Sequence, residues 1–148
     1  MILLTPELRL ALRENDVFRR AYDKTGQRFD PSPVVKLFSP LGAATWLATE
    51  LAEDDNTLFG LADLGCGCPE LGTFSLSEIA AVRMPLGLGV ERDLTFETTF
   101  PLSVWTECAR RAGSILSAQT LLRRAARSGS TPGTAPELPH DPGEPDGG

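Results

Sequence analysis

The apolar positions in the first part of the chain repeat with helical spacing. Thr5 followed by Pro6 marks a helix start, because the threonine side chain can accept a hydrogen bond from the first turn and proline there gives up no useful N–H donor. The apolar positions are Leu8, Ala11, Leu12, Val17, Phe18, Ala21 and Tyr22. We expect a helix from Pro6 to about Glu14, which the later apolar residues extend or restart after Asn15 and Asp16.

From residue 34 the spacing changes to the two-residue alternation that is typical of strands. The alternating or apolar runs occupy residues 34–38, 44–51, 57–64 and 90–97. In the first run, Val35 and Leu37 should face one side of a sheet and Lys36 the other. The acidic segment 53–56 between the second and third runs is a hairpin signal, because Asp and Asn tolerate turn dihedral angles. The pattern therefore predicts an antiparallel meander with a further strand after it.

A capping box, S-x-x-E, stands at Ser75 to Glu78 and predicts another helix start. Phe74 precedes the cap and Ile79 follows it, so the two side chains are placed to form a hydrophobic staple. The helix should end near Arg83, because a proline two residues later cannot continue it.

Two helices are expected towards the C-terminus. Pro101 opens the first, and Gly113 is a plausible end for it. Its apolar face consists of Leu102, Trp105, Cys108, Ala109 and Ala112. The second, over 116–127, is rich in arginine, and we expect it to pack on its own domain. Residues 129–148 are dense in Pro and Gly and carry no Lys or Arg, so they predict a disordered acidic tail.

Together these elements predict an α+β fold with an antiparallel sheet of about four to five strands and helices mainly on one face. We expect a single domain over 1–113, a helical extension over 114–128 and the tail over 129–148.

The charge is unevenly distributed along an otherwise ordinary globular composition of 41% hydrophobic and 23% charged residues. The net charge is −6, and the tail holds four of the acidic residues, Glu137, Asp141, Glu144 and Asp146. Basic clusters are limited to Arg19 with Arg20, and to Arg110, Arg111, Arg123, Arg124 and Arg127. We expect solvated helix faces, with contact to DNA or RNA through the second group as the alternative, against which the acidic tail would compete.

The three cysteines, Cys66, Cys68 and Cys108, do not suggest a disulfide framework, because their number is odd and the C-x-C spacing is too short for an easy mutual bridge. The first residues lack the basic segment of a signal peptide, and no apolar run is long enough to span a bilayer. These features favour a cytoplasmic protein without a membrane segment.

Five sequence blocks together resemble one bacterial family, labelled domain of unknown function 2958. The blocks are KLFSP at Lys36, ATWLATEL at Ala44, FGLADLG at Phe59, PELGTFSLSEI at Pro69 and PLGLGVERDLTF at Pro85. They cover roughly residues 3–96. The resemblance implies a protein encoded on plasmids or other mobile elements, with an accessory role and no established activity. The chain departs from the usual pattern at Thr73, Met84 and Gly89, and relatives often lack the cysteines at 66 and 68.

The glycine-rich stretch 58–78 holds the candidate binding residues, which are Asp63, Gly65, Gly67 and Glu70. The segment DLGCG resembles the first motif of a methyltransferase, but Pro69 interrupts the glycine pattern and the preceding strand belongs to a meander. We therefore expect no such cofactor, and expect the glycines to shape a loop between paired strands.

Metal-dependent chemistry has few candidate ligands in this chain. Asp63 and Glu70 lie seven positions apart across the loop, where they could share a divalent cation or perform acid–base work. A zinc site normally needs four ligands, and the sole histidine, His140, lies in the tail. A cysteine nucleophile would lack an imidazole base for the same reason. We expect no catalytic residue, metal or cofactor.

The sequence as a whole favours a small cytoplasmic binding or regulatory accessory protein that is not an enzyme. Its partner is expected to be another protein, contacted through the loop at 63–72. Two alternatives stay open. One is a metal-dependent nucleic-acid- or nucleotide-processing enzyme that uses Asp63 and Glu70, and the other is nucleic-acid binding through the C-terminal arginines.

Overall fold

A computed structural model describes residues 1–129 of the protein. The helices are α1 (Pro6–Lys24), α2 (Leu76–Ala81), α3 (Leu102–Ala112) and α4 (Ile115–Ser128), with a short 3-10 turn, η1, at Pro85–Gly87. The strands are β1 (Val35–Phe38), β2 (Thr45–Leu51), β3 (Thr57–Asp63), β4 (Glu70–Ser75) and β5 (Glu91–Arg92). Of the predicted disordered tail, Gly129 caps α4, and the remainder lies outside the described residues.

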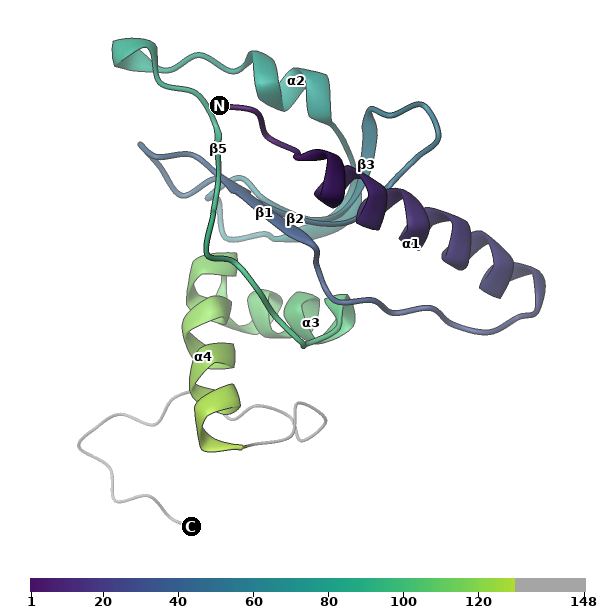
Figure 1. Ribbon diagram of the computed structural model, residues 1–148. Helices are drawn as coiled ribbons and strands as arrows, with labels where there is room; N and C mark the ends of the chain where they lie inside the picture. The colour runs from purple at the N-terminus through teal and green to yellow at the C-terminus, as the bar shows by residue number, and fades with distance from the viewer. Residues whose placement is uncertain (130–148) are drawn as a thin grey trace, which may run out of the picture.

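The strands form one antiparallel sheet in the order β4-β3-β2-β1-β5 (Figure 1). The predicted α+β class and the antiparallel sheet are thus confirmed. The predicted fourth strand is shorter than expected, because Asp93 accepts a hydrogen bond from the backbone N–H of Thr95 and turns the chain after Arg92. Within residues 1–129, no helix combines the length and apolar character needed to cross a bilayer.

Helices cover both faces of the sheet, and not mainly one face as expected (Figure 1). The reason is that the central strands carry apolar side chains on both faces, since successive residues of a strand alternate in direction. The first core, under α1 and α2, contains Leu12, Val35, Leu37, Ala48, Leu51, Leu58 and Ile79. The second core, under α3 and α4, contains Leu47, Leu61, Trp105, Cys108, Ala109, Ile115, Ala118 and Leu122.

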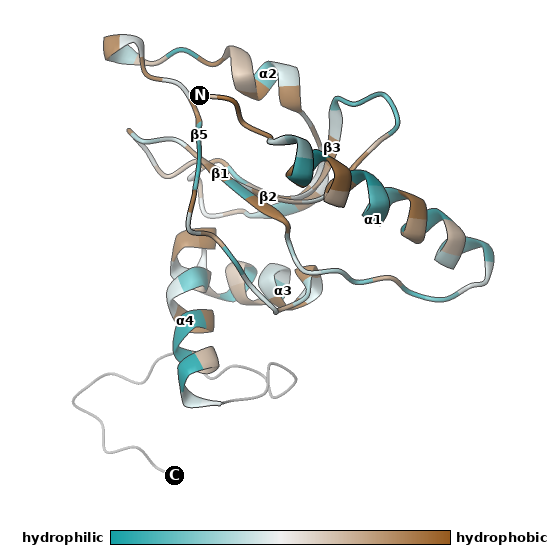
Figure 2. Ribbon diagram, in the orientation of Figure 1, coloured by the Kyte–Doolittle hydropathy of each residue, from teal (hydrophilic) through white to brown (hydrophobic). Residues whose placement is uncertain are grey.

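The helix α1 is continuous, but its apolar stripe does not follow the sheet. Leu12 is fully buried, whereas Val17 and Phe18 are 55% and 50% exposed. Figure 2 shows hydrophobic bands along α1 between hydrophilic ones. The second half of the helix therefore turns polar residues towards the sheet and apolar residues towards solvent.

A buried ionic network explains this reversal. Asp16 is paired with Arg13, Arg19 and Arg20, and Arg19 also reaches Glu50 at 2.6 Å. Burial raises the pKa of Glu50, and the ion pair with Arg19 opposes that shift. Because buried charges must be paired, the second half of α1 is docked by these contacts, whereas Leu12 in its first half packs in the first core.

Asp54 organises the β2–β3 hairpin. One carboxylate oxygen accepts the backbone N–H groups of Asn56 and Thr57, at 2.9 and 2.8 Å, and the other accepts the Thr57 hydroxyl. These hydrogen bonds lower the pKa of Asp54 to about 2.

Replacing Asp54 with alanine should therefore lower stability in a pH-dependent way. The lowered pKa means that the wild-type advantage is complete above about pH 4 and disappears as the pH falls towards about 2. Urea unfolding midpoints of wild type and Asp54→Ala across this range test it, with Glu53→Ala as the neighbouring control. A wild-type advantage that persists undiminished at pH 2 would contradict this role.

Candidate functional site

Asp63 ends β3 and is fully buried. Its carboxylate accepts the backbone N–H of Gly65 and the backbone N–H of Ile115, both at 2.9 Å. Gly65 has a φ of +88°, which lets the chain turn back towards the carboxylate. Ile115 is the first residue of α4, so Asp63 satisfies a free N–H at the helix start and joins the sheet to α4.

Glu70 does not share a site with Asp63. Its cross-strand partner is Ala62, and directly paired residues point to the same face of a sheet. Asp63 follows Ala62 in the strand, so its side chain points to the opposite face. The geometry therefore gives no support to a metal held jointly by the two carboxylates. Gly67 in the β3–β4 loop and Glu70 at the start of β4 are both exposed, and this surface stays a predicted contact surface.

The cysteines are also separated by the fold. Cys66 and Cys68 are exposed in the loop, whereas Cys108 is buried in the second core, where burial raises the pKa of its thiol. No group of three His, Cys, Asp or Glu residues in the described range is arranged to hold a metal ion.

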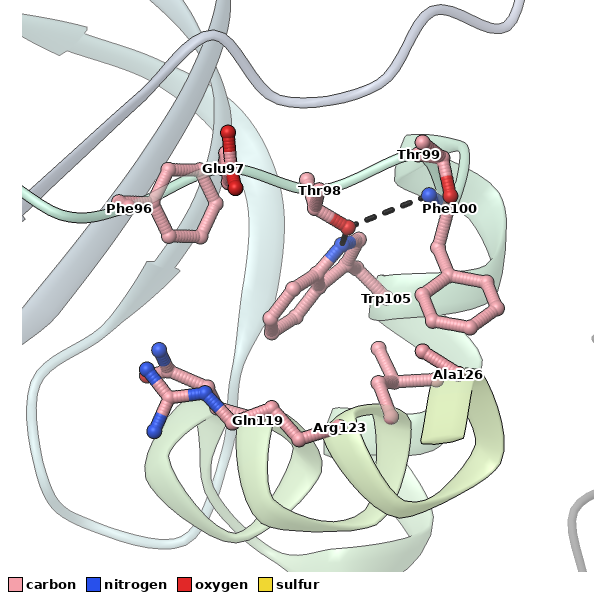
Figure 3. A pocket seen from close by; sticks show the side chains of 10 residues that line it. Phe96, Glu97, Thr98, Thr99, Phe100, Trp105, Gln119, Arg123 and Ala126 are labelled. Carbon is pink, nitrogen blue, oxygen red and sulfur yellow. Dashed lines mark hydrogen bonds between the residues drawn. The ribbon is translucent and has the colours of Figure 1, made fainter. Parts of the chain in front are cut away.

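A pocket of about 430 Å³ lies between α3, α4 and the segment before α3 (Figure 3). We call it the α3–α4 pocket. Its lining residues are Phe96, Glu97, Thr98, Thr99, Phe100, Trp105, Gln119, Leu122, Arg123 and Ala126. Three of them are aromatic, so the pocket offers apolar surface that could hold a side chain of a binding partner.

Hydrogen bonds hold the aromatic wall in place. Trp105 is 2% exposed, and its indole N–H donates to the Thr98 hydroxyl oxygen at 3.1 Å. The same oxygen accepts the backbone N–H of Phe100 at 3.2 Å, and the ring of Phe96 lies 5.9 Å from that of Trp105 (Figure 3). The pocket is thus built before any ligand arrives.

The opposite wall is polar and is anchored to the sheet. Gln119 accepts a hydrogen bond at 2.7 Å from the buried ammonium group of Lys36, which is also paired with Asp93 at 3.3 Å. Arg123 lies beside Gln119 in Figure 3 and is exposed. Within residues 1–129, Arg123 makes no ion pair, so its charge is available to a ligand.

The surface around the pocket is basic. The segment 96–129 holds five arginines against two glutamates, Glu97 and Glu107, and α4 itself has no acidic residue. In the described part of the chain, Arg111 pairs with Glu107 at 2.9 Å, while Arg123, Arg124 and Arg127 are exposed and have no ion-pair partner. Residues 114–128, expected as a helical extension, therefore complete the second core and carry a cationic outer face.

A second hollow, of about 540 Å³, lies beside β1 and β5, but its two cationic side chains, Lys36 and Arg92, already have partners. Arg92 donates to the carbonyl oxygens of Ile2 and Leu3, at 2.8 and 2.9 Å. Lys36 is held by Gln119 and Asp93. The α3–α4 pocket, with its unpaired arginine, is therefore the better candidate site.

The sequence pattern predicted Trp105 as a core residue, which is confirmed, but it did not predict the pocket beside it. The sequence carries little sign of this pocket, because Thr98 and Gln119 lie far apart in the chain and only the fold brings them around the Trp105 indole.

Comparison with known proteins identifies one family. The profile of the family described as "Protein of unknown function (DUF2958)" matches residues 3–116. No curated protein and no solved structure gives a significant match. The matched range contains the whole sheet and α3 but only the first two residues of α4, so the α4 wall of the pocket lies beyond it. The chain belongs to the DUF2958 family.

Proposed function

We propose that this protein is a small cytoplasmic accessory protein without catalytic activity, which binds an acidic segment of another protein at the α3–α4 pocket. The observation that carries the proposal is the aromatic pocket with Arg123 on its rim, which makes no ion pair within residues 1–129. A role in mobile-element biology, which the resemblance of the sequence blocks implies, is the setting we infer for it.

The aromatic wall of the pocket suits an apolar side chain of such a ligand, and Arg123 suits its acidic residues. Binding energy at protein interfaces is concentrated in aromatic residues and arginines near a well-packed pocket. An apolar side chain of the partner would bury against the partly exposed ring of Phe96. Carboxylates beside that anchor would meet Arg123 through charge-assisted hydrogen bonds.

Ligands can be selected from a library of displayed random peptides, and the selected sequences should combine an apolar anchor with Asp or Glu. The substitution Ala126→Trp fills the pocket from an exposed position and should weaken binding about tenfold or more, which corresponds to about 1.4 kcal/mol. Thr120→Trp, on the same helix but outside the pocket, should leave affinity within about threefold of wild type. Equal affinities for the two variants would refute the site.

Charge reversal separates protein binding from nucleic-acid binding. Arg123 lines the pocket and Arg124 does not, so Arg123→Glu should abolish peptide binding while Arg124→Glu has little effect. Phosphate contacts with nucleic acid are more nearly interchangeable, since each neutralised phosphate contributes similarly. Salt-dependent retention on DNA that both variants weaken equally would favour the nucleic-acid alternative instead.

A further inference from the structure

The order of charges along the chain places an acidic segment directly after the basic one. The arginines of α4 end at Arg127, and the helix ends at Ser128. Residues 130–148, outside the described structure, contain Glu137, Asp141, Glu144 and Asp146 and no Lys or Arg. A segment with the charge that the proposed function expects of the ligand is therefore covalently attached beside the pocket.

The same segment is also rich in proline. It contains five prolines, which are Pro132, Pro136, Pro139, Pro142 and Pro145. Proline-containing peptides bind in aromatic-lined grooves, because they lose little conformational entropy there and their rings pack on aromatic side chains. Phe96, Phe100 and Trp105 line the α3–α4 pocket, and the partly exposed ring of Phe96 is the aromatic surface available for such packing.

The segment can reach the pocket. Ala126 lies two residues before the last residue of α4, and the helix distance from Gly129 back to Gln119 is about 15 Å at 1.5 Å per residue. An extended chain covers about 3 Å per residue, so about five residues span that distance. Attachment through so short a connection gives an effective concentration on the order of millimolar, which makes even weak contacts competitive.

We propose that residues 130–148 bind in cis to the α3–α4 pocket and the arginine face of α4, and so act as a built-in competitor of the external partner. The proposal rests on the proposed function, because it takes the same surface as the binding site. The partner then gains access only when it outcompetes the segment, and salt weakens the competition because exposed charge pairs are screened.

The test uses the full-length protein. In the variant E137Q/D141N/E144Q/D146N, the four carboxylates become amides of similar size. The matched control S130N/T131N/T134N changes the same segment without changing its charge. A synthetic peptide of residues 130–148 is the probe, its affinity is measured by isothermal titration, and the indole N–H resonance of Trp105 is followed by NMR.

We expect the neutralised variant to bind the peptide at least about tenfold more tightly than wild type and the control, because its own segment no longer competes. The Trp105 resonance should differ between wild type and the neutralised variant. In wild type it should be independent of protein concentration. A resonance that changes on dilution would instead assign the contact to a second copy of the chain and overturn the cis proposal.

Failure of this proposal can be told apart from failure of the proposed function. If wild type and the neutralised variant bind the selected acidic peptides equally well, the competitor is wrong and the pocket function stands. The same conclusion follows if the selected peptides bind but the 130–148 peptide does not. If no acidic peptide binds either protein, both proposals fall.

Discussion

Replacing Gly60 with alanine should prevent the sheet from forming in its native register. Gly60 lies in β3 opposite Ala48, where β2 has a bulge between Ala48 and Glu50. A Cβ atom at this position would lie 1.8 Å from the carbonyl oxygen of Leu47 and 2.9 Å from the Cα of Ala48. Both are backbone atoms of the neighbouring strand, so no side-chain rotation can relieve the clash.

We expect Gly60→Ala to lower the free energy of unfolding by about 4 kcal/mol or more. Gly72 is the matched control, because it pairs with Gly60 in the next strand and its added Cβ would meet nothing within 4 Å. Gly72→Ala should change stability by less than about 1 kcal/mol. Urea unfolding followed by circular dichroism measures both, and equal midpoints for the two variants would show that the close approach does not limit the fold.

The second large effect is expected at Asp63. Alanine would leave the backbone N–H groups of Gly65 and Ile115 without their acceptor, and the bond to Ile115 is buried. We expect Asp63→Ala to cost about 3 kcal/mol of stability, because each unsatisfied buried donor carries a desolvation penalty. The start of α4 should loosen with it, which would lower the near-ultraviolet dichroism of Trp105.

Two companion variants make the Asp63 measurement specific. Asp63→Asn keeps one acceptor oxygen and should lose less stability than alanine. Glu70→Ala, at the exposed first residue of β4, should change stability by less than about 0.5 kcal/mol. If Asp63→Ala were as stable as Glu70→Ala, the carboxylate would not be a structural link. If Asp63→Ala also fails to bind a partner, that loss would follow from its lower stability. It would not show that Asp63 contacts the partner.

The local elements followed from the sequence because their signals are local. Ser75 accepts the backbone N–H of Glu78 at 3.2 Å, as the capping box predicts, and Phe74 packs against the core that contains Ile79. Gly113 ends α3 with a φ of +87°. Each of these features depends on residues a few positions apart, for which spacing alone is informative.

The orientation of α1 was harder to predict. The helical spacing of apolar residues continues along the helix, but the side chains that face the sheet change from apolar to polar. The apolar residues of its second half read as an extension of the buried stripe, yet Val17 and Phe18 are exposed and Asp16 is buried. The residues that pair with the polar face of α1, above all Glu50, lie in β2, which the helical pattern of α1 does not include. Burial of an ion pair is decided by both partners, so one helix cannot reveal it.

The sequence by itself determined the helix starts, four of the five antiparallel strands and the face that each β1 side chain occupies, whereas β4 lies at Glu70–Ser75, partly within the expected loop. Val35 and Leu37 do enter one core, while Lys36 reaches Gln119 on the other face. Only the tertiary structure decided that Asp63 caps a helix that begins 52 residues later, and that α3 and α4 enclose an aromatic pocket beside Arg123. The physical reason is distance along the chain: caps and strand alternation are set by near neighbours, whereas a buried hydrogen bond or a pocket needs groups that only the complete fold brings together.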